Sequence, residues 1–370
     1  MSGDPRTGVS PPPRGPGAGG RKDPDLRPRT PDPRGDREPV RIGVVGVGHL
    51  GQHHARVVAA LAGVRLVGIL DTDPARRAEA AARFGVPGHA DHRELLGRVD
   101  AACVAVPTRH HRAVAGDLLA GGVDVLVEKP IADSVAEAEA LVDLASGAHR
   151  ILQVGHIERF NGAVRALRGL VDAPGFIEAH RLSPYAGRGT DVDVILDLMI
   201  HDIDIVLSLV RSPLETVHAT GVPVLTDQVD IANARLQFAS GCVANLTASR
   251  VSMNRMRKIR LFQRDAYLSV DYASQEIALY RRLPPDPAAG DGAGARLPRI
   301  VREDVAVERA EPLRLELESF LACVRDRRRP VVSGEDGREA LRVAEEIRRR
   351  LEAHLARLTP VRSFGGSVVR

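Results

Sequence analysis

Two side chains of this sequence have the types and spacing that a proton-transfer site needs. Asp197 and His201 are four residues apart in the segment LDLMIHDID, which places both on one face of a predicted helix. The positions between them are apolar, so the segment is expected to be buried, where charge is costly unless it is paired or used. An aspartate at this spacing can fix the tautomer of the histidine, and the pair predicts an oriented general base for a hydroxyl proton. The alternatives are a structural histidine and a metal site, although no third ligand is evident.

Residues 41–51, RIGVVGVGHLG, have the form of a dinucleotide-binding turn. The apolar run 42–47 predicts a buried strand, and a helical pattern follows the glycines. In this G-x-G-x-x-G pattern the glycines allow a tight turn, a close approach of pyrophosphate and close helix packing. The N–H groups of the helix N-terminus would face the phosphates. The predicted cofactor contacts in this turn are Gly46, Gly48, His49, Leu50 and Gly51.

Asp71 ends a second apolar run, residues 64–70, about 20 residues after the last glycine of the motif. A carboxylate at the end of this strand can accept hydrogen bonds from the adenosine ribose. It would also repel a 2′-phosphate, so the sequence predicts NAD rather than NADP. Arg76 and Arg77 fall in the next helical pattern and are expected to face solvent. A glycine-rich turn in an unrelated α/β protein is the alternative explanation.

The tripeptide Glu128-Lys129-Pro130 follows another predicted strand, residues 124–127. Ligands of open α/β sheets bind beyond the carboxyl ends of the strands, so Lys129 is expected to point toward the nicotinamide. There it could donate to a substrate oxygen or stabilise developing negative charge. A lysine exposed at a strand end is the alternative. Pro130 is a candidate for a cis peptide bond.

Strand and helix patterns divide the chain into two folded parts, and together they predict an α/β fold. Residues 40–155 alternate strand and helix, which predicts an N-terminal Rossmann domain with a doubly wound parallel sheet. Residues 156–360 predict an α+β domain with a large open, mainly antiparallel sheet, whose last two helices can pack back on the Rossmann domain. The segment 1–39, rich in Pro, Gly and Arg, is expected to be a disordered tail, and 361–370 a second tail. The strands expected in the second domain are 216–220, 231–238, 243–249, 257–263, 266–271 and 276–280.

Composition narrows the class of protein. A net charge of +4 over 370 residues does not favour a nucleic-acid partner, and no apolar run is long enough for membrane insertion. The three cysteines are widely spaced and match no metal pattern, which favours buried thiols in a reducing compartment. With no signal-peptide pattern at the N-terminus, a cytoplasmic location is expected.

Four motifs together resemble the Gfo/Idh/MocA oxidoreductase family over about residues 40–360. They are the glycine motif, Pro107-Thr108 with His111, Glu128-Lys129-Pro130, and Asp197-x-x-x-His201-x-x-Asp204. The resemblance implies NAD(P)-dependent oxidation or reduction of a sugar or cyclitol hydroxyl. It gives His201 the role of base, Lys129 that of holding and polarising the reacting oxygen, and Asp197 that of orienting the site. It adds Pro107, Thr108, His111, Glu128 and Lys129 to the cofactor contacts.

Two segments, QVGHIERFN at 153–161 and LDLMIHDID, are similar to a branch of the family that oxidises the 3-hydroxyl of UDP-N-acetylglucosamine. The implied substrate is a nucleotide sugar, and the keto product would feed an aminotransferase in an amino-sugar or lipid A type pathway. Arg159, Asn161 and Asp204 are the expected substrate contacts. The family's glycines before the aspartate are absent here. Other sugars, other nucleotide sugars and inositol stay open as substrates, and a non-catalytic NAD-binding regulator is a remote alternative.

A basic cluster between residues 250 and 264 could serve the same substrate. Strand alternation puts Lys258, Arg260 and Arg264 on one side and Arg255 and Arg257 on the other. One side could meet a diphosphate through charge-assisted hydrogen bonds, while a solvated face or a subunit contact is the alternative. Since an open sheet face in this family usually pairs with another, a homodimer or homotetramer is expected.

Overall fold

The glycine motif lies in a six-stranded sheet whose strands are all parallel, in the order β3-β2-β1-β4-β5-β6. This is the computed structural model of the chain, and it describes residues 38–185, 192–285 and 298–358. The two predicted tails lie almost wholly outside those residues. The strand order is that of a Rossmann fold, which confirms the doubly wound parallel sheet. The strands are β1 Val40–Val45, β2 Val64–Leu70, β3 Gly88–His89, β4 Ala101–Val104, β5 Asp124–Glu128 and β6 Leu152–Gly155.

Helices cover both faces of this sheet, which is why its central strands are apolar nearly throughout. Local sequence fixes where the helices begin and end. In α2 the Asp73 side chain accepts hydrogen bonds from the backbone N–H groups of residues 75 and 76, Pro74 occupies the first turn, and Gly85 ends the helix in a left-handed conformation. The elements are α1 His49–Ala60, α2 Pro74–Phe84, α3 His111–Ala120, α4 Val135–Gly147, and the short 3₁₀ turns η2 His92–Leu95 and η3 Thr108–His110.

The second sheet has eight strands in the order β14-β13-β12-β11-β7-β10-β9-β8. It is mainly antiparallel, as predicted, with β7 and β10 running parallel. The six predicted strands are present, and β7 and β14 are additional. The strands are β7 Phe176–Leu182, β8 Leu214–Val222, β9 Ile231–Phe238, β10 Val243–Ser249, β11 Met256–Gln263, β12 Ala266–Asp271, β13 Glu276–Leu283 and β14 Arg299–Asp304.

The two additional strands lack the apolar alternation that sequence analysis relies on. In β7 the inward positions are 177, 179 and 181, and the last of these is a buried arginine held by carboxylates. Strand β14 is an edge strand with little burial on either side. Neither strand therefore carries a hydrophobic pattern of period two.

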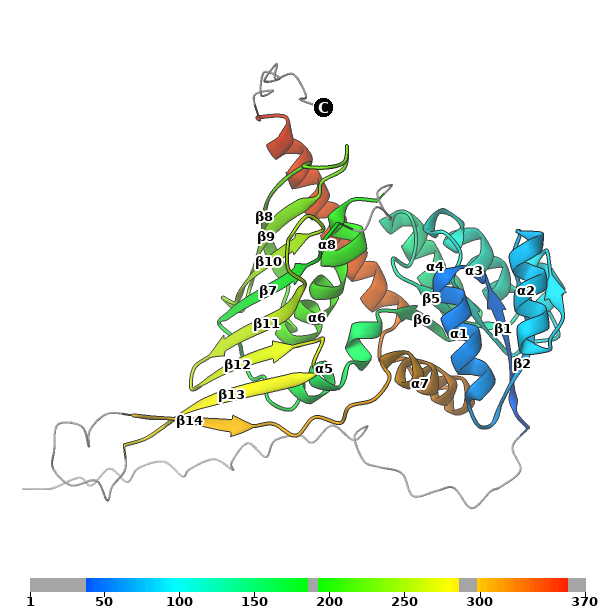
Figure 1. Ribbon diagram of the computed structural model, residues 1–370, viewed down its shortest axis with the longest axis horizontal. Coiled ribbons are helices and arrows are strands. Elements are labelled where there is room, and N and C mark those ends of the chain that lie inside the picture. Colours follow the sequence, from blue (N-terminus) through cyan, green and yellow to red (C-terminus); the bar gives the residue numbers. More distant parts are fainter. Residues whose placement is uncertain (1–37, 186–191, 286–297, 359–370) are drawn as a thin grey trace, which may run out of the picture. The chain divides into compact units, whose positions relative to one another are not determined.

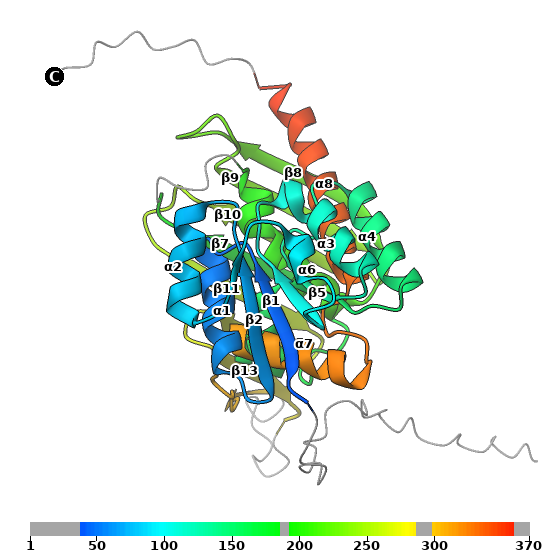
Figure 2. The same cartoon turned by 90° about the vertical axis from the view of Figure 1, so that its right-hand side faces the viewer.

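Helices α6 and α8 lie on one face of the eight-stranded sheet, and in Figure 1 no described helix covers the other face. Helix α7 instead packs against α1, with Leu317 and Phe320 buried in the same cluster as Ile42 and Val44 (Figure 1, Figure 2). The C-terminal helices thus contact both sheets. None of the described helices combines the length and apolarity needed to cross a bilayer. The remaining elements are η4 Ile157–Phe160, α5 Gly162–Leu167, η5 Ile195–Met199, α6 Ile200–Val210, α7 Pro312–Asp326 and α8 Gly334–Leu355.

Candidate active site

The glycine turn between β1 and α1 has the geometry that a bound pyrophosphate requires. Gly46 has a φ of +86°, and a Cβ there would lie 2.6 Å from the carbonyl oxygen of Ala105. At Gly51 a Cβ would lie only 1.7 Å from the carbonyl oxygen of Gly46. A Cβ at Gly48, by contrast, would meet no atom within 4 Å. Two glycines therefore permit close packing, and the third leaves open space for a phosphate to approach the backbone.

A cavity of about 810 Å³ adjoins this turn, a size suited to a small-molecule cofactor. Six of the predicted cofactor contacts line it, namely Gly46, Gly48, His49, Leu50, Asp71 and Pro107. The lining also includes cationic side chains that the sequence did not single out, among them Arg93 and Arg109. This combination of open backbone, acidic strand end and basic rim fits NAD. The other predicted contacts, Gly51, Thr108, His111, Glu128 and Lys129, lie outside this lining.

Asp71 is buried at the end of β2 and is held by three donors. Its Oδ2 accepts from the backbone N–H of Val47 at 3.0 Å. Its Oδ1 accepts from the N–H of Asp73 at 2.9 Å and from Arg76 Nη2 at 3.2 Å. Arg77 donates to the backbone oxygen of Asp71 at 2.7 Å. Arg76 is half exposed, as expected, and Arg77 is partly buried. The sequence did not predict their contacts with Asp71, which arise because α2 starts directly after β2 and its first turn lies over the strand end.

Replacing Asp71 with serine is expected to shift cofactor preference toward NADP. The change removes the charge that repels a 2′-phosphate and releases Arg76 to bind it. A hydrogen bond to a charged group contributes about 1.5–3 kcal/mol, so the ratio of kcat/KM for NADP to that for NAD should rise roughly 10- to 100-fold. The measurement is steady-state kinetics with both cofactors. Adding Arg76→Gln should abolish the gain with NADP, and an unchanged ratio in Asp71→Ser would contradict the assignment.

The Glu128-Lys129-Pro130 turn is held by histidines on either side. The Lys129–Pro130 peptide bond is cis, as the sequence suggested. His54 Nε2 lies 2.8 Å from Glu128 Oε1, and the two ring nitrogens of His111 lie 2.8 Å and 2.9 Å from the backbone oxygens of Pro130 and Val106. His111 therefore connects this turn to the loop that follows β4. A direct contact of His111 with the cofactor stays a prediction.

Lys129 reaches from this turn to the segment before α6. Its Nζ donates to the backbone oxygen of Asp197 at 2.7 Å and lies 3.8 Å from Asp197 Oδ1. Burial lowers the pKa of Lys129, while the charge of Asp197 opposes that shift. The structure thus brings together two of the three predicted catalytic residues, which are far apart in sequence.

Asp197 lies in a π-helical turn, η5, that precedes α6. The spacing of Asp197 and His201 predicted a regular helix through both residues, so this turn is a correction. Asp193 caps the segment by accepting from the N–H groups of Ile195 and Leu196 at 3.0 Å and 3.1 Å. Single π-helical turns inside α-helices are often found at functional sites. Here the turn places the backbone oxygen of Asp197 against Lys129.

His201 lies in the first turn of α6, with its Nδ1 buried and unpartnered among the described residues. Burial lowers the pKa of His201 well below its ordinary value of 6.5, and the positive charges of Lys129 and Arg181 act in the same direction. The imidazole is therefore neutral at pH 7 and able to accept a proton. Within the described chain no hydrogen bond joins it to Asp197, whose role in orienting the ring stays a prediction.

The three predicted substrate contacts are buried and have partners within the protein. Arg159 Nη1 lies 3.1 Å from Asp204 Oδ1, and Arg159 Nη2 donates to the backbone oxygen of Val331. Asn161 caps α5 by accepting from the N–H of residue 163, and its side-chain amide donates to the backbone oxygen of Tyr272. These contacts give the three side chains a positioning role, and direct contact with substrate stays a prediction.

A buried ionic network beside His201 was missed at the sequence level. Arg181, on β7, donates to Glu158 at 2.9 Å and to both carboxylate oxygens of Asp202 at 2.9 Å and 3.0 Å. All three side chains are buried. The available signal was the unusual run of acidic and basic residues in QVGHIERFN and LDLMIHDID, which also holds Arg159 and Asp204. A buried ionic network destabilises the fold when one of its charges lacks a partner. Here the bonds of Arg181 to Asp202 hold β7 against α6.

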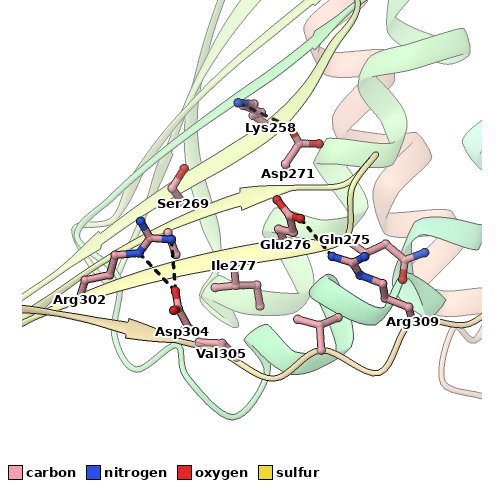
Figure 3. A pocket seen from close by; sticks show the side chains of 12 residues that line it. Lys258, Ser269, Asp271, Gln275, Glu276, Ile277, Arg302, Asp304, Val305 and Arg309 are labelled. Carbon is pink, nitrogen blue, oxygen red and sulfur yellow. Dashed lines mark hydrogen bonds and ion pairs between the residues drawn. The ribbon is translucent and has the colours of Figure 1, made fainter.

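The basic cluster is divided between the two faces of the sheet. Lys258 and Arg260 lie on the uncovered face and pair with Asp271 and Glu178. A cavity of about 500 Å³ on this part of the sheet is lined by further pairs, and Figure 3 shows Arg302 with Asp304 and Arg309 with Glu276. Because these cations already have carboxylate partners, this cavity is poorly suited to a diphosphate. Arg257 lies on the other side, on the same face as the buried Ile259 and Leu261.

No group of three His, Cys, Asp or Glu side chains in the described ranges is placed to hold a metal ion. The three cysteines, Cys103, Cys242 and Cys323, are buried, and no disulfide joins any two of them. The described site offers a lysine paired with Asp197, a neutral histidine and a dinucleotide cavity.

Comparison with known proteins agrees with this geometry. Residues 40–156 match the family model for the Gfo/Idh/MocA oxidoreductases with an NAD-binding Rossmann fold, and residues 148–268 match the model for a Gfo/Idh/MocA C-terminal domain. A UDP-N-acetylglucosamine 3-dehydrogenase of Acidithiobacillus ferrooxidans is 38% identical over 319 residues, covering 86% of this chain and 99% of that protein. An inositol 2-dehydrogenase of Rhizobium meliloti is 26% identical and covers 83% of this chain and 95% of its own length.

Solved structures give the same result. The UDP-N-acetylglucosamine 3-dehydrogenase GnnA of Acidithiobacillus ferrooxidans superposes with a TM-score of 0.78 at 38% identity, covering 85% of this chain and 98% of that one. A scyllo-inositol dehydrogenase of Lactobacillus casei with bound NAD(H) and scyllo-inositol has a TM-score of 0.69 at 20% identity over 85% of this chain and 97% of that chain. The second match supports the fold alone.

Proposed function

Because the chain belongs to the Gfo/Idh/MocA family of NAD-binding oxidoreductases, we propose that it oxidises the 3-hydroxyl of UDP-N-acetylglucosamine to the 3-keto sugar. The observation that carries the proposal is the contact of Lys129 with Asp197, directly before the helix that holds His201. The choice of sugar is supported by the 38% identity to a UDP-N-acetylglucosamine 3-dehydrogenase that this chain covers almost completely.

The proposed reaction divides the work among a few side chains. Gly48 and the N-terminus of α1 would hold the pyrophosphate, and Asp71 the adenosine ribose. When bound, NAD supplies the hydride acceptor. Lys129 would donate a hydrogen bond to the reacting oxygen, and neutral His201 would take the hydroxyl proton as the carbon–hydrogen bond breaks.

A substrate panel tests this proposal. NADH formation is measured with UDP-N-acetylglucosamine, free N-acetylglucosamine and myo-inositol at equal concentrations. Turnover confined to the nucleotide sugar is the expected result. Turnover of inositol alone would favour the second candidate, which is supported by the inositol 2-dehydrogenase of Rhizobium meliloti. Absence of turnover with any substrate would favour a non-catalytic regulator.

The product also suggests what acts next. A 3-keto sugar is the form to which an aminotransferase can add nitrogen, so we infer that such an enzyme consumes it, as in amino-sugar or lipid A type pathways. A cytoplasmic location is proposed with it, since nucleotide sugars are made and used there.

The uncovered face of the eight-stranded sheet supports a homo-oligomer. Four aromatic side chains form a row across neighbouring strands in a chain that is only 3% aromatic. Phe176 packs on Phe262, Phe262 stacks on Tyr267 at 4.8 Å, and Tyr267 stacks on Tyr280 at 5.6 Å. The Phe262 side chain is 37% exposed. A row of partly exposed rings on an uncovered face fits a second copy of the chain as its partner.

Replacing Phe262 and Tyr267 with glutamate is expected to convert the oligomer to a monomer. Two carboxylates buried opposite their symmetry copies would remain desolvated and unpaired. The mass in solution, measured by size-exclusion chromatography with light scattering, should fall to that of one 39.8 kDa chain. Retention of the wild-type mass would show that another surface forms the contact.

The pH profile of kcat/KM should report the neutral imidazole of His201. A base must be unprotonated, and the pKa of His201 lies below 6.5 because of burial and its cationic neighbours. Activity is therefore expected to be flat from about pH 7 downward to below 6.5, and to fall as the pH drops through the lowered pKa. An acid limb centred above pH 7 would contradict the assignment.

A further inference from the structure

A group of buried polar atoms without partners lies behind His201. Within the described ranges, no hydrogen bond is made by Nδ1 of His201, by either ring nitrogen of His156, or by Oδ2 of Asp204. His156 is 1% exposed and Asp204 is 2% exposed. Because native proteins pair the great majority of buried polar atoms, a cluster of four such atoms requires an explanation.

The geometry links these atoms into a chain. His156 directly follows β6, while His201 and Asp204 are three residues apart on α6. The rings of His156 and His201 are perpendicular, with centroids 6.4 Å apart. This separation is too long for a direct hydrogen bond between the rings and matches a bridge through a single water, and buried waters usually have two to four polar partners.

The charges around the two rings differ in sign. The groups that face His201 are Lys129 after β5, Arg181 on β7, Arg257 on β11 and the ring of His156, so no carboxylate is among its main electrostatic neighbours. His156 also faces cations, Arg159 on η4 and Lys129, but its strongest charged neighbour is the carboxylate of Asp204, with Glu128 of β5 adding to it. Burial lowers the pKa of both rings, and it is the first cause in each case. At His156 the carboxylates of Asp204 and Glu128 offset part of this effect, while the main charged neighbours of His201 are cations that add to it, so His156 is the less unfavourable of the two rings for a proton.

We propose that His156 is a proton-relay residue, which takes the substrate-derived proton from His201 and holds it beside Asp204. The proposal rests on the proposed dehydrogenase function. The hydroxyl O–H bond would break and its proton would bind Nε2 of His201, with NAD, when bound, supplying the acceptor for the hydride from the carbon. The proton on Nδ1 of His201 moves through one water to His156. It returns by the same path to bulk water when the product leaves, so the net release is one proton for each NADH.

His156→Asn tests the relay, because asparagine keeps a polar group near the Nδ1 position but does not titrate. The rate of a single turnover is measured in mixtures of H₂O and D₂O. In the wild type the dependence on deuterium content should be curved, because more than one proton moves in the step. In His156→Asn the rate should fall about tenfold and the dependence should become linear. His180→Asn, on the uncovered face of the sheet, is the control and should leave both unchanged.

A second readout needs neither substrate nor cofactor. Histidines labelled with ¹⁵N are titrated by NMR in the wild type and in His156→Asn, and also in His156→Phe if the first variant melts at a lower temperature. Coupling predicts that the wild-type rings of His156 and His201 titrate together, and that the pKa of His201 changes in the variant. A folded variant with an unchanged His201 titration and a curved isotope dependence would overturn the relay. Failure of UDP-N-acetylglucosamine as a substrate would overturn the proposed function and leave the NMR coupling as the test of the relay.

Discussion

His201→Asn is expected to lower kcat by about 10²- to 10⁴-fold, the usual contribution of a general base. Asparagine fills much of the same volume and keeps polar atoms, but it cannot accept a proton. The ring is half-buried, with Nδ1 inside the protein, and desolvation and the charges of Lys129 and Arg181 lower its pKa well below 6.5, so it is neutral near pH 7. The loss should therefore appear in the chemical step, while the Kd for NAD stays near the wild-type value because His201 does not line the dinucleotide cavity.

Stopped-flow measurement of NADH formation separates the rate of the chemical step from the binding of NAD and substrate. The matched control is His218→Asn, on an exposed position of β8. It should retain wild-type kinetics. If His201→Asn keeps kcat within a few-fold of the wild type, the histidine is structural and another group takes the proton.

Lys129→Met is expected to lower kcat/KM by about 10²- to 10³-fold, the range seen when one preorganised donor to a developing oxyanion is removed. Methionine preserves the length and the apolar stem of the side chain but removes the ammonium group. The same change removes a positive charge that lowers the pKa of His201, so the acid limb of the pH profile should move to higher pH.

The control for this variant is Lys258→Met. Lys258 is half exposed on the uncovered sheet face and pairs with Asp271, so its loss should leave kcat/KM and the pH profile unchanged. A folded Lys129→Met enzyme with a full rate and an unshifted acid limb would show that the lysine only supports the turn between the two parts of the site.

The Rossmann part was predictable from sequence because its signals are local. The glycines, the acidic strand end and the apolar strands are set by steric and burial rules that act within a few residues. Three of the strands of the second sheet, β9, β10 and β12, begin and end where the alternation predicted. Strand β7 was not found because Arg181 occupies an inward position, and only its carboxylate partners from distant elements make that burial possible.

The sequence predicted most of the residues of the site, but fewer of the contacts between them. Lys129 and Asp197 meet, but through the backbone oxygen of Asp197 in a π-helical turn, which the four-residue spacing of Asp197 and His201 does not reveal. His156 belongs to the segment QVGHIERFN, yet the absence of a partner for its two ring nitrogens among the described residues depends on what α6 places beside β6. The hydrogen bond from Arg76 to Asp71 depends on the position of α2 over the end of β2. In each case the deciding contact is between elements that sequence spacing does not relate.

The most direct test of the account uses UDP-N-acetylglucosamine that carries deuterium at carbon 3 of the sugar. The purified enzyme is incubated with this substrate and NAD, and the NADH is analysed by mass spectrometry. The account predicts one deuterium in each NADH and a 3-keto sugar that has lost it. Unlabelled NADH, or no NADH from this substrate, would contradict the claim that Lys129 and His201 oxidise the 3-hydroxyl.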